Sequence, residues 1–212
     1  MNPPYWNRAR RALASRDPRL AAIIARYPRV VLRSRGEPFV TLARSIVGQQ
    51  ISVRAADTVW QRLGDRLPEL TPAALAKTQS RSLRACGLSV RKVEYLKDLA
   101  LHFRSGRIDP TRFDTMTDEA IVAELTEIRG IGRWTVEMLL IFNLMRPDVL
   151  PLDDIGLLRA IGQQYFDAEP PQSLNTRDGR QRITALARAW QPWRSVATWY
   201  LWRSLDPLPV EY

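Results

Sequence analysis

Two adjacent carboxylates are the first candidates for chemistry in this sequence. Asp153 and Asp154 follow Pro151 and precede a segment with helical spacing of its apolar residues. Aspartate is a favoured residue at the start of a helix, and Asp153 fits that capping role. Asp154, one position further, is not needed for capping. It is therefore the better candidate for a carboxylate that takes part in a reaction.

A second candidate lies about twenty residues upstream, in a turn with two glycines. Gly130 and Gly132 permit positive φ angles and close approach of another surface to the backbone. Gly132 would open a helix, so unpaired N–H groups there would favour an anion, helped by Arg133 and Thr135. The alternative is an ordinary corner between two helices, in which a glycine only ends the first helix.

The charge of the chain indicates an anionic partner. Its 212 residues include 32 Lys and Arg against 22 Asp and Glu, a net charge of +10. Residues 1–36 hold nine arginines and one acid, Asp17. Nucleic acid is the leading candidate for the partner. The N-terminal arginines either add salt-sensitive, non-specific affinity or only solvate an outer helix.

Several other classes of protein are excluded by composition. A single cysteine, Cys86, excludes an internal disulfide framework, a zinc ribbon and a four-cysteine iron–sulfur cluster. A single histidine, His102, argues against a histidine-rich metal site or a hydrolase triad. The apolar runs are too short to span a bilayer, and the N-terminus lacks the pattern of a signal peptide. We therefore expect a soluble protein of a reducing compartment.

Helical spacing of apolar residues continues along almost the whole chain, whereas no convincing alternation typical of strands occurs. The prediction is an all-α fold of about ten helices with short loops. The expected helices span Arg8 to Tyr27, Ser52 to Leu63, Ser89 to Phe103, Thr117 to Leu125, Gly132 to Leu144, Asp153 to Tyr165, Arg180 to Ala189 and Pro192 to Leu205, with further starts at Thr71 and Ser80 and a loop over Glu169 to Arg177.

Four segments in this order resemble the helix–hairpin–helix/Gly-Pro-Asp superfamily of DNA glycosylases, and within it the 3-methyladenine DNA glycosylase II family. The likeness spans about residues 38–205 and looks like the short form of that family, without the N-terminal β-rich domain of the longer enterobacterial enzymes. The segments are Ile46–Ser52, Ile128–Thr135, Pro151–Asp154 and Trp190–Ser195 continuing to Trp202.

The resemblance implies a two-lobed architecture and an activity. Residues 38–146 would form one helical lobe ending in the hairpin, and residues 1–37 with 147–212 the other, with a cleft for DNA and base between them. The implied activity is that of a monofunctional DNA glycosylase of base excision repair. Such an enzyme hydrolyses the N-glycosidic bond of alkylated purines, the 3-methyladenine and 7-methylguanine class, in nucleotides flipped out of duplex DNA.

The same resemblance assigns roles to individual residues. Asp154 would be the catalytic carboxylate, which stabilises positive charge on the deoxyribose and orients the attacking water. Trp134, Met138 and Trp202 would line the base pocket, where an indole face attracts a cationic base. The alternative for these three side chains is packing in the core.

Two further groups of residues are assigned to DNA contact. Gln50 would be the wedge that fills the gap left by the flipped base, with Gln49 and Ser52 beside it; the alternative for Gln50 is a surface glutamine at a helix start. The hairpin would hold the DNA backbone through Gly130, Ile131, Gly132, Arg133 and Thr135. A monovalent cation would bind the backbone carbonyls of Thr126, Ile128 and Ile131.

Two departures from the family pattern affect the mechanism and the hairpin. Arg129 stands where relatives usually have proline, which predicts a less rigid turn. Trp134 stands where bifunctional members have a lysine, and the only lysines are Lys77, Lys92 and Lys97. None of these lysines is near the hairpin, so we expect no abasic-site lyase activity. The cluster-bearing relatives need four C-terminal cysteines, which this chain lacks, so we expect no iron–sulfur cluster, and we expect no cofactor for catalysis.

Two alternatives to this function stay open. The chain could be a non-catalytic helix–hairpin–helix module that binds DNA, or a glycosylase for uncharged deaminated or oxidised bases. In each case the expected partner is double-stranded DNA, and the expected protein is a monomer that acts in the cytoplasm on the nucleoid, away from membranes.

Overall fold

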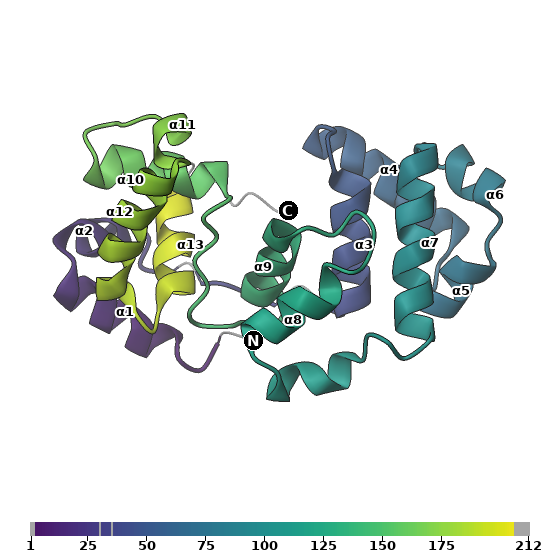
Figure 1. The fold of residues 1–212 in the computed structure, drawn as a ribbon, viewed down its shortest axis with the longest axis horizontal. Coiled ribbons are helices and arrows are strands. Elements are labelled where there is room, and N and C mark those ends of the chain that lie inside the picture. The colour runs from purple at the N-terminus through teal and green to yellow at the C-terminus, as the bar shows by residue number, and fades with distance from the viewer. Residues whose placement is uncertain (1–2, 30, 35, 206–212) are drawn as a thin grey trace. The chain divides into compact units, whose positions relative to one another are not determined.

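The computed structural model describes residues 3–29, 31–34 and 36–205. Over these residues every regular element is a helix, which confirms the all-α prediction (Figure 1). Thirteen α-helices and two short 3-10 helices occur in this part of the chain, more than the ten expected. None of these helices is long and apolar enough to cross a membrane.

The chain divides into two compact units. Within the described residues, unit 1 comprises 3–34 and 140–205, and unit 2 comprises 36–139. The second boundary was predicted at 146/147, after the helix expected there. In the structure the division lies between 139 and 140, inside the helix Arg133–Phe142, and Phe142 stacks on Trp202 of the same unit with ring centroids 5.6 Å apart.

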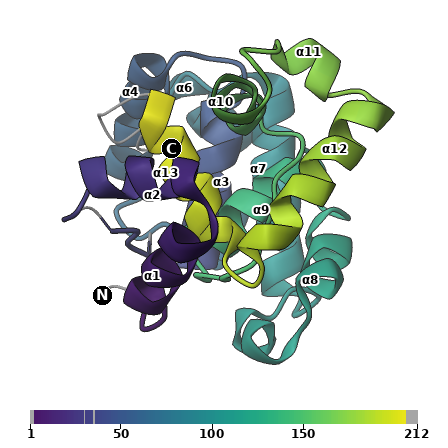
Figure 2. The ribbon, with the colours of Figure 1, turned by 90° about the vertical axis from the view of Figure 1, so that its left-hand side faces the viewer.

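Unit 1 is built around its last helix, α13, which contacts α1, α2 and α10 (Figure 2). Large side chains are fully buried there, among them Trp6, Trp190 and Tyr200. The helices of this unit are α1 (Trp6–Arg16), α2 (Pro18–Arg26), α10 (Ile155–Tyr165), α11 (Pro171–Leu174), α12 (Arg177–Ala187), η2 (Arg188–Trp190) and α13 (Arg194–Leu205).

The single N-terminal helix expected over Arg8 to Tyr27 is wrong, because the chain breaks between α1 and α2 at Asp17. This buried carboxylate caps α2 by accepting the N–H groups of Arg19 and Leu20 through Oδ1. Its Oδ2 accepts the Tyr165 hydroxyl and the Trp190 indole N–H, each at 2.8 Å. The break is therefore stabilised by partners far away in the sequence.

The arginine-rich N-terminal segment is not a free arm. One face of α1 enters the core of unit 1 through Trp6, Ala9 and Leu13. Two of the arginines donate hydrogen bonds to backbone carbonyls of the same unit, Arg16 to Gln191 at 2.7 Å and Arg19 to Gln164.

Unit 2 packs around α7, which contacts α3, α5 and α6. Ser52, Thr71, Ser89 and Thr117 each cap a helix by accepting a backbone N–H three residues on. The helices are α3 (Pro38–Gly48), α4 (Val53–Arg66), α5 (Pro72–Lys77), α6 (Ser80–Ala85), α7 (Val90–Arg104), η1 (Pro110–Thr115), α8 (Asp118–Leu125) and α9 (Arg133–Phe142), the last of which ends in unit 1.

The loop expected over Glu169 to Arg177 is partly wrong, since it contains the short helix α11. Pro170 directly precedes this single turn and Pro171 is its first residue; proline is tolerated there because its missing N–H would have no partner in the first turn of a helix.

Candidate active site

The carboxylate of Asp154 lies at the N-terminus of α10 in unit 1. The residue is only 6% exposed. Its Oδ1 atom accepts two hydrogen bonds, from the backbone N–H of Leu157 at 2.6 Å and from the indole N–H of Trp202 at 2.8 Å. A side chain held by two donors of different elements has a fixed orientation, which a carboxylate needs if it is to face a reacting group.

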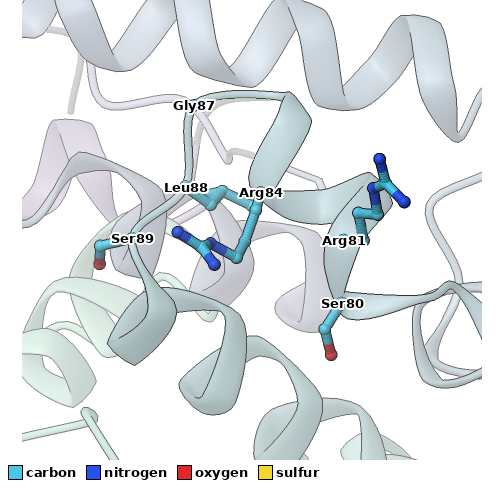
Figure 3. A pocket seen from close by; sticks show the side chains of 6 residues that line it. All are labelled: Ser80, Arg81, Arg84, Gly87, Leu88 and Ser89. Carbon is cyan, nitrogen blue, oxygen red and sulfur yellow. The ribbon is translucent and has the colours of Figure 1, made fainter.

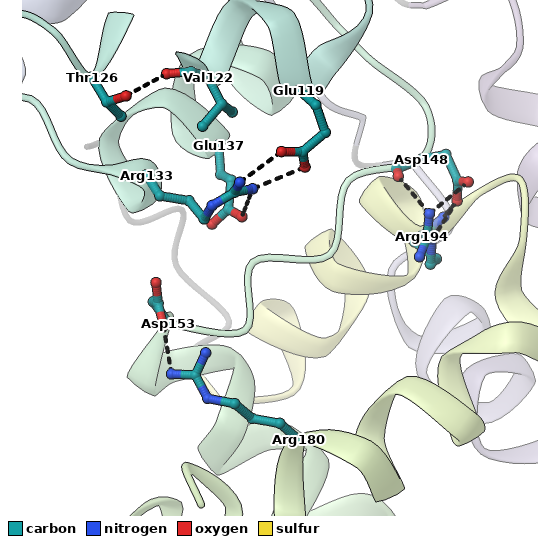
Figure 4. A network of polar contacts seen from close by, with 9 residues as sticks. All are labelled: Glu119, Val122, Thr126, Arg133, Glu137, Asp148, Asp153, Arg180 and Arg194. Carbon is teal, nitrogen blue, oxygen red and sulfur yellow. Dashed lines mark hydrogen bonds and ion pairs between the residues drawn. The ribbon is translucent and has the colours of Figure 1, made fainter. Parts of the chain in front are cut away.

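The capping role that was expected of Asp153 belongs to Asp154. Asp154, not Asp153, is the N-cap of α10, because a turn from Pro151 to Asp154 delays the first helical residue to Ile155. Asp153 lies outside the helix, half-exposed, and forms an ion pair with Arg180 at 2.6 Å (Figure 4). The Asp154 carboxylate thus serves as a cap in addition to any chemical role.

Two residues that the sequence analysis missed complete the surroundings of Asp154. Phe142 stacks on the half-buried ring of Trp202 with an interplanar angle of 12°. A Cβ atom at Gly156 would lie 3.1 Å from Oδ1 of Asp154 and 3.5 Å from Nε1 of Trp202. Gly156 leaves room for this hydrogen bond, and a glycine in the first turn of a helix was the available signal.

The turn between α8 and α9, residues 126–132, forms the hairpin in unit 2. Ile128 and Ile131 are buried and anchor the turn, and the N–H of Ile131 donates to the carbonyl of Ile128 at 3.1 Å. The two positions differ in whether the fold requires a glycine. Gly130 has φ +85°, and a Cβ there would lie 2.2 Å from the ring of Tyr95. Gly132 has no positive φ, and a Cβ there would meet nothing within 4 Å.

The fold therefore requires Gly130 but does not require Gly132. Gly132 is exposed and directly precedes α9, so it lies at the positive end of the dipole of that helix. Without a side chain at that place, a ligand backbone could approach the start of the helix closely.

The loop between α3 and α4, residues Gln49–Ser52, contains the predicted wedge. Gln50 is exposed and has φ +58°, a left-handed conformation that is costly for most residues other than glycine and asparagine. The side chain of Gln49 turns to the hairpin and donates to the carbonyl of Gly130 at 2.7 Å. Ser52 caps α4 through the N–H of Ala55. Gln50 is thus not at a helix start but in a strained, exposed turn tied to the hairpin.

The structure opposes one predicted contact of α9 with DNA and qualifies another. Thr135 is only 6% exposed, so its hydroxyl is not presented at the start of the helix as expected. Arg133 forms a two-point ion pair with Glu119, at 2.6 and 3.0 Å, and lies 3.8 Å from a carboxylate oxygen of Glu137 (Figure 4). The hydrogen bond from Arg133 lowers the pKa of Glu119. The charge of Arg133 is therefore largely compensated.

The predicted base-pocket residues of α9 lie on one face of that helix. Trp134, Met138 and Phe142 are spaced by four residues, which puts them one above the other. Trp134 is half-buried and Met138 is buried.

The backbone N–H of Arg129, which a proline would lack, donates to the carboxylate of Asp98 on α7 at 2.8 Å. This hydrogen bond fastens the hairpin to α7. That the turn is less rigid than one with proline stays a prediction. Asp98 could not be identified from sequence because it lies 31 residues away from Arg129.

A hollow of about 610 Å³ lies elsewhere in unit 2, at the corner between α6 and α7 (Figure 3). It is lined by Ser80, Arg81, Arg84, Gly87, Leu88 and Ser89, none of which was predicted as a site residue.

Comparison with known proteins identifies the family. Residues 43–185 match the model of the HhH-GPD superfamily of base excision DNA repair proteins. DNA-3-methyladenine glycosylase 1 of Schizosaccharomyces pombe is 34% identical over 193 residues, which are 88% of this chain and 80% of that protein.

Two solved structures are similar over almost the whole chain. A DNA-3-methyladenine glycosidase from Bacillus halodurans has a TM-score of 0.82 and 33% identity, over 95% of this chain and 90% of the other. The Schizosaccharomyces pombe 3-methyladenine DNA glycosylase Mag1, in complex with abasic DNA, has a TM-score of 0.75 and 28% identity, over 97% and 98%. The chain belongs to the HhH-GPD superfamily of base excision DNA repair proteins.

Proposed function

We propose that this protein is a monofunctional DNA glycosylase that removes alkylated purines from double-stranded DNA. The single observation that carries the proposal is Asp154, a carboxylate 6% exposed and held on Oδ1 by the N–H groups of Leu157 and Trp202. The family supports base excision repair as the process. The substrate class is supported by the relatives, which are named as 3-methyladenine glycosylases.

Cleavage of the N-glycosidic bond of an alkylated purine requires few catalytic groups besides such a carboxylate. Cleavage of an N-glycosidic bond builds positive charge on the deoxyribose, and a fixed carboxylate shielded from water stabilises that charge better than water does. Asp154 would also orient the attacking water. A purine alkylated at N3 or N7 is already cationic and leaves readily, so the reaction needs no strong general acid.

The base pocket would be formed by Trp134, Met138 and Trp202, with Phe142 behind Trp202. A stacked indole attracts a cationic base through its electron-rich face, by roughly 1–2 kcal/mol when desolvated. The stack of Phe142 on Trp202 supports this role, because it holds the indole ring in one plane.

DNA would be held by the hairpin of unit 2. The duplex would be opened by the loop Gln49–Ser52 of the same unit, the wedge loop. The start of α9, next to the exposed Gly132, is suited to a phosphate of the lesion strand because a helix N-terminus favours an anion. Gln50 would enter the duplex in place of the flipped nucleotide. Its exposed, strained backbone supports this role, since such strain concentrates at functional sites.

A monovalent cation at the hairpin belongs to the proposal. Its ligands would be the backbone carbonyls of Thr126, Ile128 and Ile131, and uncharged oxygens are suitable ligands for such an ion. The carbonyl of Ile128 accepts the N–H of Ile131 and keeps a second lone pair for a cation. When bound, the cation would add positive charge beside a DNA phosphate.

We also propose that the protein lacks abasic-site lyase activity. Trp134 occupies the position at which a Schiff-base lysine would be needed. The ammonium of Lys92 donates to the carbonyl of Val47 at 2.7 Å, in the last turn of α3. The enzyme would act as a monomer, on the DNA of the cytoplasm.

The decisive experiment incubates the purified protein with methylated duplex DNA and identifies the released bases by chromatography. We expect 3-methyladenine and 7-methylguanine. Release of hypoxanthine or oxidised purines alone, from DNA that carries them, would replace this substrate class by the uncharged one. Binding without release of any base would identify a non-catalytic module. A covalent complex trapped by borohydride would overturn the absence of lyase activity.

A further inference from the structure

One face of α7 contacts both the hairpin and the end of α3 that leads into the wedge loop. Lys92, Tyr95 and Asp98 follow one another at intervals of three residues and so share a face of the helix. Lys92 reaches the end of α3, immediately before the wedge loop, while Tyr95 and Asp98 reach the hairpin.

The contact of Lys92 is with an unpaired end of a helix. Its Nζ atom donates to the carbonyl of Val47 at 2.7 Å. Val47 lies in the last turn of α3, where carbonyls have no intrahelical partner and a positive charge is favoured by the helix dipole. Burial lowers the pKa of Lys92, so the ammonium is partly removed from solvent to make this contact.

The contacts of Tyr95 and Asp98 fix the hairpin against the same helix. The ring of Tyr95 packs so closely on Gly130 that no side chain fits there. Asp98 accepts the N–H of Arg129 at 2.8 Å. The hairpin is thereby fastened to α7 at two successive residues.

A hydrogen bond also joins the wedge loop directly to the hairpin. Gln49 donates from Nε2 to the carbonyl of Gly130 at 2.7 Å. Two residues shortly before Gln50 in the chain are thus held by hydrogen bonds. Lys92 binds the carbonyl of Val47, and the hairpin binds the side chain of Gln49. A residue keeps a left-handed conformation only where its surroundings impose it, and these contacts do so.

We propose that Lys92 is a positioning residue for the wedge: from α7 it sets the place of Gln50 relative to the hairpin. This inference rests on the proposed function, in which the hairpin holds the DNA backbone and Gln50 fills the gap left by the flipped base. Lys92 acts on the opening of the base pair and not on the cleavage of the bond. Its loss therefore affects lesions that must be unpaired more than lesions that are already unpaired.

The test compares Lys92→Met, Lys92→Arg and Lys97→Met in the full-length protein. Methionine keeps an apolar stem but cannot bond Val47, whereas arginine keeps the charge and the donors. Lys97 is the matched control, because it lies on the same helix and donates to the C-terminal carbonyls of another helix, Leu75 and Ala76 of α5. The substrates are duplexes with 7-methylguanine opposite cytosine or opposite an abasic site.

We expect Lys92→Met to lower the single-turnover rate about tenfold on the paired lesion, since small misplacements near a reaction are costly, and about twofold on the unpaired one. Lys92→Arg should restore most of the rate, and Lys97→Met should show no preference between the two substrates. An equal loss on both substrates, or the same preference in Lys97→Met, would overturn the proposal.

A second measurement does not depend on base release. 2-Aminopurine beside the target position reports unstacking by its fluorescence, and Lys92→Met should lower this signal at saturating protein while Lys97→Met leaves it unchanged. If the wild type unstacks the base but releases none, the proposed function fails and the role of Lys92 is still decided by this signal. An unchanged signal in Lys92→Met would refute that role.

Discussion

The two units present their candidate functional groups in opposite ways. In unit 1 the group is a single side chain, Asp154, which is buried and held by Leu157 and Trp202. In unit 2 the groups are exposed backbone atoms and one strained residue, on the hairpin and the wedge loop. Chemistry needs one charge in a fixed place, whereas DNA contact needs accessible backbone. Substitutions in unit 1 should therefore affect turnover, and those in unit 2 affinity and opening of the duplex.

Asp154→Asn should have the largest effect. We expect kcat to fall by at least about 10²–10³-fold, because a neutral amide cannot stabilise the positive charge of the sugar. DNA affinity should stay nearly unchanged, since asparagine is also a good N-cap and preserves the start of α10. Single-turnover release and fluorescence anisotropy measure the two quantities. Asp153→Asn, on the neighbouring exposed residue, is the control, and full activity of Asp154→Asn would refute the assignment.

The two glycines of the hairpin separate folding from binding in unit 2. Gly130→Ala should lower the free energy of unfolding by about 2–3 kcal/mol, because the methyl group meets Tyr95 and the φ is positive. Gly132→Ala should leave stability unchanged and weaken DNA binding about tenfold, equivalent to about 1.4 kcal/mol. Urea unfolding and anisotropy give both values. Unchanged affinity in Gly132→Ala would remove the start of α9 from the DNA interface.

Trp202→Phe tests whether the indole N–H orients Asp154. The phenyl ring can still stack on Phe142 but cannot donate to Oδ1, so we expect kcat to fall about tenfold. Trp190→Phe is a matched control, because it removes an indole N–H that donates to another carboxylate, Asp17, also at 2.8 Å. Both variants should lose stability, but only Trp202→Phe should lose rate. Equal rates in the two variants would contradict this role.

Gln50→Gly should have a small effect on stability, opposite in sign to that of Gly130→Ala. Glycine adopts a φ of +58° without strain, so the free energy of unfolding should rise by about 0.5–1 kcal/mol. Release of paired lesions should slow at the same time, because the wedge is lost. Gln50→Asn, which tolerates this conformation and keeps an amide, should retain most of the activity. A variant that is both more stable and fully active would show that Gln50 is only a surface residue.

Local patterns sufficed for much of the fold. Residues within a few positions of one another sufficed to predict most helices, the helix starts at Thr71 and Thr117, the turn of the hairpin and Asp154 as the candidate carboxylate. Their roles in catalysis and DNA contact stay predictions.

The features that sequence reasoning missed depend on distant partners. The helix break at Asp17 is stabilised by Tyr165 and Trp190, whose donors lie 148 and 173 residues away. The anchoring of Arg129 by Asp98 spans 31 residues, and the contact of Lys92 with Val47 spans 45. That Asp154 and not Asp153 caps α10 has a local cause, a turn that moves the helix start by one residue.

The division of unit 1 along the chain has a consequence during protein synthesis. Its α1 and α2 precede unit 2 in the chain, whereas α13, which both of them contact, follows it. All of unit 2 leaves the ribosome in between, and a compact unit can fold as soon as it has emerged. The arginine-bearing helices therefore remain without α13, whose Trp199 and Tyr200 pack on Trp6, until that helix has been synthesised. Nascent chains stalled before α13 should hold a folded unit 2 behind an N-terminal segment open to proteases and chaperones.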